Sequence, residues 1–173
     1  MELNITAELR FIEEKKIPAL MQAIEPKEII KKSLFGLKKS IEYIDNFEEY
    51  LNENSVLIDT FDNKGFLVIS DLVEFLREYK KINIDKSLFK EVSEKHNERE
   101  ECAIFINYKS AIELNEKLDN ILIEEIELTR YYKERDGISI EKAIPSQIDQ
   151  VSRLIKAMKL IKPDYALYIR GEG

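Results

Sequence analysis

Hydrophobic residues recur at intervals of three or four positions over most of this chain. That interval places side chains on one face of an α-helix. The longest regular run extends from Pro26 to about Glu53. We place the start of the helix at Pro26, because proline is favoured at the first position of a helix. Its hydrophobic positions are Ile30, Leu34, Leu37, Ile41, Ile44, Phe47 and Leu51. The pattern predicts one helix about 42 Å long, at about 1.5 Å per residue.

Shorter stretches with the same spacing predict the other helices. Polar capping residues, prolines or glycines bound most of them. The predicted helices cover residues 6–17, 70–81, 86–97, 107–135 and the segment from Pro145 to Pro163. Three short apolar stretches, residues 66–69, 102–106 and 165–169, are compatible with extended structure. The second stretch can instead begin the helix that follows it, and the sequence leaves both alternatives open.

Composition agrees with long helices in one domain. The chain has 173 residues, 44% of them hydrophobic, with only five glycines and four prolines. We therefore expect a single helical domain, residues 1–173, of the all-α class: an elongated bundle of about five to six helices. A helix from Cys102 to Arg135 would be about 51 Å long, against a diameter of roughly 40 Å for a compact chain of this length. Either the bundle is elongated or this helix needs a partner, so we also predict self-association through a coiled coil.

Charge is distributed unevenly along the chain, whose net charge is −7. Residues 27–39 contain five lysines and one glutamate, whereas residues 41–63 contain seven acids and no base. On one helix this order would oppose the helix dipole, which favours acids at the N-terminus. Either neighbouring helices compensate these charges, or the two blocks form a bipolar binding surface. The candidate partner-binding residues are Lys27, Lys31, Lys32, Lys38, Lys39, Glu42, Asp45, Glu48 and Glu49.

Motifs of common enzymes are missing from the sequence. A single histidine, His96, excludes zinc and di-iron motifs that need two. No P-loop, GxGxxG, GxSxG or CxxC motif occurs. A calcium loop around Gly65 is disfavoured, because Lys64 would lie at the ion. We expect no catalytic residue, no metal site and no cofactor.

The function that these features favour is a non-catalytic helical protein–protein interaction module, such as an assembly subunit, an adaptor or an inhibitor. Its partner is another protein or a second copy of the chain. The alternative is a nucleic-acid-associated accessory protein that uses the Lys27–Lys39 face. A helix-turn-helix over residues 70–97 is disfavoured, since glutamates offset the lysines of its second helix. The single cysteine, Cys102, the acidic N-terminus and the lack of a long apolar run favour a cytoplasmic protein without a membrane segment.

Overall fold

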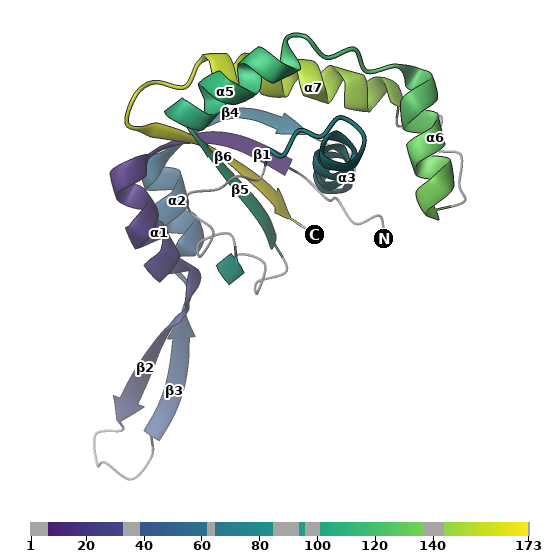
Figure 1. Ribbon diagram of the computed structural model, residues 1–173. Coiled ribbons are helices and arrows are strands. Elements are labelled where there is room, and N and C mark those ends of the chain that lie inside the picture. Colours follow the sequence, from purple (N-terminus) through teal and green to yellow (C-terminus); the bar gives the residue numbers. More distant parts are fainter. Residues whose placement is uncertain are drawn as a thin grey trace.

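A computed structural model describes residues 7–32, 39–61, 65–84, 94–95, 101–136 and 144–172. Within these residues the chain forms six β-strands and six α-helices (Figure 1). The protein is therefore a mixed α/β protein, and the predicted all-α class, with its helical bundle and coiled coil, is wrong.

Four strands form the main sheet, in the order β4-β1-β6-β5, and each pairs antiparallel with its neighbour. The strands are β1 (Ala7–Glu13), β4 (Ser55–Phe61), β5 (Glu101–Asn107) and β6 (Tyr165–Glu172). A second, two-stranded sheet pairs β2 (Lys27–Lys32) with β3 (Lys39–Ile44).

Helices cover both faces of the main sheet (Figure 1). They are α1 (Ile17–Ile24), α2 (Phe47–Asn54), α3 (Gly65–Glu78), α5 (Tyr108–Leu118), α6 (Glu125–Asp136) and α7 (Ile144–Lys159), with a short 3-10 turn, η1 (Glu14–Lys16), before α1. Helices α3, α5, α6 and α7 pack on one face, and α1 and α2 pack on the other.

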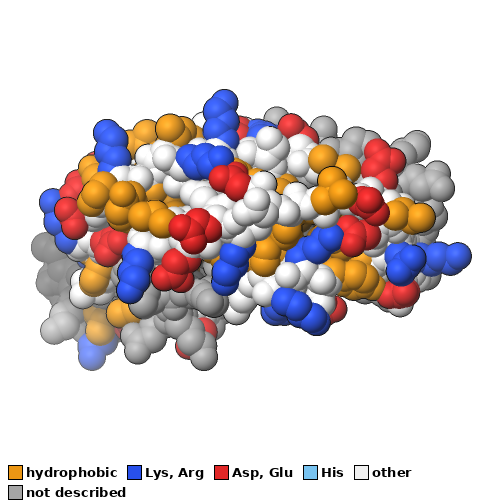
Figure 2. Space-filling model, turned by 45° about the horizontal axis from the view of Figure 1, so that its top comes forward, with side chains coloured by type: hydrophobic (Ala, Val, Ile, Leu, Met, Phe, Trp, Pro, Cys, Tyr) orange, Lys and Arg blue, Asp and Glu red, His pale blue; other side chains and the backbone are white. Residues whose placement is uncertain are grey.

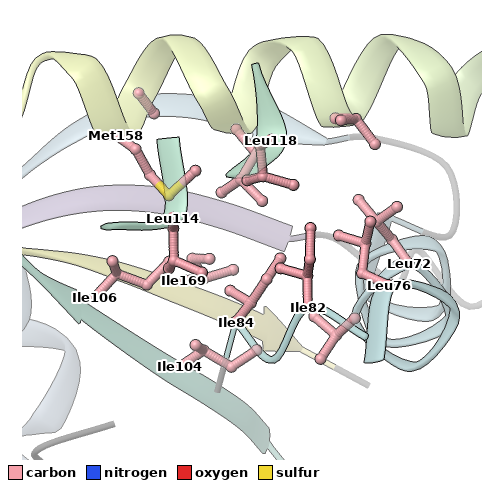
Figure 3. Close-up of a cluster of buried hydrophobic side chains, with 14 of the residues drawn as sticks. Leu72, Leu76, Ile82, Ile84, Ile104, Ile106, Leu114, Leu118, Met158 and Ile169 are labelled. Carbon is pink, nitrogen blue, oxygen red and sulfur yellow. The ribbon is translucent and has the colours of Figure 1, made fainter. Parts of the chain in front are cut away.

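The side chains of β6 alternate between the two faces of the sheet, and each face has its own hydrophobic core. Leu167 and Ile169 belong to the core under α3, α5, α6 and α7, whereas Ala166 and Tyr168 belong to the core under α1 and α2. Successive side chains of a strand point to opposite faces, so a central strand with both faces covered is apolar nearly throughout. Figure 3 shows the first core, which combines Met158 of α7, Leu114 of α5 and Ile169 of β6.

The predicted helix over residues 26–53 is wrong: of its described residues, 27–32 and 39–44 pair as antiparallel strands, and only those of α2 are helical. Ile30 lies directly opposite Ile41 in the hairpin. Eleven residues separate them, which is about three helical turns, so a helix and a hairpin share this spacing. Isoleucine is β-branched and packs well in cross-strand pairs. In the sequence, Gly36 lies midway between two isoleucine-containing stretches, and a glycine between two such stretches is a signal for a hairpin.

The predicted helix over residues 6–17 is strand β1 followed by η1 and the start of α1. Leu9 and Ile12 are three positions apart, which suggested one helical face. In the structure they lie in different cores, on opposite faces of β1. The three-residue spacing therefore reflects a strand that is buried on both sides.

The predicted helix over residues 107–135 is two helices, α5 and α6, separated by residues 119–124. Residues 102–135 do not form one helix of about 51 Å, so helix length gives no reason to expect self-association. The stretch 66–69 lies inside α3 and is not extended. The stretch 165–169 lies in β6, and 102–106 lies in β5, which is the extended one of the two alternatives left open for it. Helix α3 overlaps the predicted helix 70–81 but begins at Gly65 and ends at Glu78, and α7 overlaps the predicted helix from Pro145 to Pro163 over most of its length. Most of the predicted helix 86–97, with His96, lies outside the described residues.

Candidate functional site

Strands β2 and β3 form a ribbon that we call the arm. Its register runs from Lys27 opposite Ile44, next to the body, to Lys32 opposite Lys39. Figure 1 shows the arm extending from α1 and α2, away from the main sheet. Six residues at about 3.4 Å each give it a reach of about 20 Å. The arm therefore offers both of its faces to other molecules.

Three large hydrophobic residues lie on one face of the arm, which they share with Glu28, Lys32 and Lys39. Ile30 and Ile41 are opposite each other, and Tyr43 lies two positions farther along β3 on the same side. Their exposed fractions are 56%, 56% and 66%. Single exposed hydrophobic residues are common on proteins, but three neighbours on a projecting element indicate a contact surface. We call these residues the hydrophobic face of the arm.

The structure gathers the predicted lysines on the arm rather than on a helix. Lys27, Lys31 and Lys32 lie on β2, and Lys39 lies on β3. Lys38 lies outside the described residues. Lys31 forms an ion pair with Glu42 of β3, so part of the positive charge is compensated within the arm.

The predicted acidic residues have different structural roles. Asp45 follows the arm, and its carboxylate accepts a hydrogen bond from the backbone N–H of Phe47 at 3.0 Å. Glu48 and Glu49 lie in the first turn of α2, where the helix dipole favours acids. Glu48 binds Arg170, whereas Glu49 is exposed. The acidic block is therefore largely structural, and it lies at the base of the arm.

Two buried arginines on the central strands hold α2 against the sheet, and one of them also contacts the first residue of β4. Arg10 is 7% exposed and Arg170 is 3% exposed. The Arg10 guanidinium donates to Glu8 at 2.6 Å and to Ser55 and Asn52 at 3.1 and 3.2 Å.

The Arg170 guanidinium donates to both carboxylate oxygens of Glu48, one of them at 3.2 Å. Its Cζ also lies 5.0 Å from the centre of the Phe47 ring, which is within cation–π range. These contacts hold α2, and α2 continues directly from the arm. Neither arginine stood out in the sequence, because a charged residue within a short strand does not by itself show whether its side chain is buried.

The space between the α1–α2 layer and the arm contains a small pocket. It has a volume of about 240 Å³ and includes Gln22, Lys27, Asn46 and Tyr50. The Tyr50 hydroxyl donates to the backbone carbonyl of Lys16 at 2.9 Å, and burial raises the pKa of this phenol. Tyr50 therefore stays neutral at physiological pH, and it helps to fix α2 against η1.

A larger groove lies on the opposite face of the molecule, between α7 and the connection from α5 to α6. Its volume is about 430 Å³, within the range of pockets that enclose small ligands or several side chains. Its hydrophobic lining comprises Leu118, Ile121, Leu122, Ile123, Val151 and Ile155. Figure 2, turned so that α5 and α7 come toward the viewer, shows hydrophobic side chains between charged ones on this side.

Lys80, just after α3, holds the wall of this groove in place. Its ammonium group donates to the backbone carbonyl of Leu122 at 2.9 Å and to the Glu127 carboxylate at 2.7 Å. The hydrogen bond from Lys80 holds the pKa of Glu127 below its ordinary value. The groove is therefore preformed. The sequence hid it, because Leu118, Ile121 and Leu122 fit one face of an unbroken helix.

Among the residues that the structure describes, no three histidine, cysteine or acidic side chains are grouped so as to hold a metal ion. In the same part of the chain, every helix is too short or too polar to cross a lipid bilayer. Comparisons of the chain with models of protein families, with curated proteins and with solved structures found no match.

Proposed function

We propose that this protein is a non-catalytic interaction protein whose arm binds a protein partner, in the role of an assembly subunit, an adaptor or an inhibitor. The observation that carries the proposal is the hydrophobic face of the arm, Ile30, Ile41 and Tyr43. Covering these side chains would remove apolar surface from water, at about 25 cal/mol for each Å². The proposal includes a cytoplasmic location, which the single cysteine supports because a protein without disulfides suits a reducing compartment.

The position of the arm supports the proposal. A two-stranded ribbon is only marginally stable by itself. Here the arm continues directly into α2, which Arg170 and Glu48 hold on the sheet. An anchored, projecting ribbon can reach into a partner while the body keeps its own fold.

A nucleic-acid partner is the second candidate, and the lysines of the arm are the observation that favours it. A two-stranded ribbon fits the major groove of DNA. However, β2 and β3 together carry four lysines against two glutamates, and Lys31 is already paired with Glu42. So small a positive surplus would contact few phosphates, and the isoleucines would have no apolar counterpart on the nucleic-acid backbone. Protein binding is therefore the better-supported function.

Site-specific photo-crosslinking tests the proposal. A photoreactive amino acid replaces Tyr43 in one form of the protein and Glu53, an exposed α2 residue outside the arm, in the control form. In cells that make the protein, we expect the form labelled at position 43 to crosslink reproducibly to one protein, and Ile41→Asp to abolish the crosslink. An equal crosslinking pattern from both positions would overturn the proposal.

Fluorescence anisotropy with a duplex DNA and a single-stranded RNA at low salt tests the alternative. We expect weak binding that Lys31→Glu with Lys39→Glu changes little. Strong binding that this double variant abolishes would favour the nucleic-acid function instead.

A further inference from the structure

The arm and the groove have complementary properties, although they lie on different parts of the molecule. The arm carries exposed hydrophobic side chains next to lysines. The groove is lined by hydrophobic side chains, and acidic residues adjoin it. One wall of the groove runs from Leu118 to Ile123, and the longer segment around it, residues 113–127, contains six acids and one lysine.

The acidic residues beside the groove are partly paired and partly exposed to solvent. Asp119 pairs with Lys159, and Glu127 pairs with Lys80. Glu116, Glu124 and other glutamates of the segment are exposed. Because the arm has a small positive surplus and this segment a larger negative one, their encounter is electrostatically favourable.

The arm cannot reach the groove of its own chain. It extends from the α1–α2 layer on one face of the sheet, and the groove lies in the layer of α5 and α7 on the other face (Figure 1). A contact between them therefore requires two molecules.

We propose that the partner of the arm is a second copy of this chain, and that Ile30, Ile41 and Tyr43 of each copy insert into the α5–α7 groove of the other. This inference rests on the proposed function, since it specifies which protein the arm binds. Reciprocal exchange closes a two-fold dimer, the commonest symmetry of protein oligomers, and it uses both surfaces of both copies. A groove held open by Lys80 receives the arm without first having to form.

The test uses two substitutions at exposed positions, so that folding is preserved. Ile41→Asp alters the arm. Leu122→Asp alters the groove, where Leu122 is 71% exposed. Matched controls are Val56→Asp on β4 and Ile126→Asp on α6, which are comparably exposed but belong to neither surface. The mass of each protein is measured by light scattering and sedimentation over a range of concentrations.

We expect the parent chain and both controls to dimerise. We expect Ile41→Asp and Leu122→Asp each to weaken dimerisation at least about tenfold, the effect of losing about 1.4 kcal/mol. An equimolar mixture of these two variants should recover a dimer, because it keeps one intact arm and one intact groove that face each other. If the arm met another arm, or the groove another groove, the mixture would not associate beyond its separate components.

A parent chain that stays monomeric at the highest concentration would overturn this inference. So would a mixture that recovers no dimer. If the form labelled at position 43 still crosslinks to a different protein, the proposed function survives while the second copy is rejected. If it crosslinks to nothing, both fail.

Discussion

The ion pair between Glu48 and Arg170 offers the most direct test of how the arm is anchored. Glu48 lies in the first turn of α2, and the Arg170 guanidinium, which donates to it, is 3% exposed. The substitution is Glu48→Gln. Glu49→Gln is the matched control, because Glu49 lies in the same helical turn, is also exposed and loses the same charge, while both carboxylate hydrogen bonds described for Arg170 go to Glu48.

The expected loss follows from the burial of the two partners. A hydrogen bond to a charged group contributes about 1.5–3 kcal/mol, and breaking a fully buried ion pair costs about 3–5 kcal/mol. The Glu48 side chain is 56% exposed, so water screens the pair and partly replaces the lost contact. We expect Glu48→Gln to lower the free energy of unfolding by about 1–2 kcal/mol more than the control. Both variants lose the interaction with the helix dipole, about 0.3–1 kcal/mol, which cancels in the comparison.

Urea unfolding followed by circular dichroism measures this difference, and thermal unfolding should show a lower midpoint by about 2–8 °C. The double variant with Arg170→Met completes a thermodynamic cycle that isolates the coupling between the two side chains. If Glu48→Gln and Glu49→Gln differ by less than about 0.5 kcal/mol, which is the usual scatter for surface substitutions, the ion pair does not anchor α2 and the reasoning is wrong.

Two further predictions concern the helices around the groove. The Asn107 side chain caps α5 by accepting a hydrogen bond from the backbone N–H of Ser110 at 2.9 Å; Asn107→Ala should cost about 1 kcal/mol in urea unfolding, whereas Asn107→Asp should retain the cap, and equal losses would contradict this role. Asp59 accepts a hydrogen bond from Arg153 at 2.7 Å, which lowers the pKa of its carboxyl group. The ionised Asp59 carboxylate therefore stabilises the fold above the unfolded-state pKa, near 4, and this stabilisation is lost as the pH falls through the lowered folded-state pKa. Between neutral and acidic pH, Asp59→Asn should lose less stability than the parent. An identical loss in both proteins would refute this role of Asp59.

Sequence patterns were reliable where one face of an element meets the core. The spacing of Leu72, Phe75, Leu76 and Tyr79 predicts one side of a helix; the structure buries the first three, whereas Tyr79 lies just after α3 and is 36% exposed. The helix predicted after Pro145 is present as α7, and the stretch 165–169, compatible with extended structure in the sequence, lies in β6. In each case the local spacing matches one geometry only, or a proline defines the boundary.

Patterns failed where two structures share one spacing. Ile30 and Ile41 are about three helical turns apart, yet they also pair across a hairpin. The helical period therefore did not distinguish the long helix from the arm. The lysines of residues 27–39 were correctly noted as a block, but their place on a projecting ribbon depends on which partner each strand finds.

The sequence alone determined which residues are apolar, where the charges are concentrated along the chain, and which enzyme motifs are missing. Only the tertiary structure decided that β1 and β6 are central strands with both faces covered, that Arg10 and Arg170 lie buried beside α2, and that residues 119–124 open a groove instead of continuing a helix. The physical reason is that spacing along the chain describes local contacts, whereas strand pairing joins residues such as Leu9 and Ile169, far apart in sequence. The spacing of hydrophobic residues within one segment therefore does not show which distant segment will cover a given face of it.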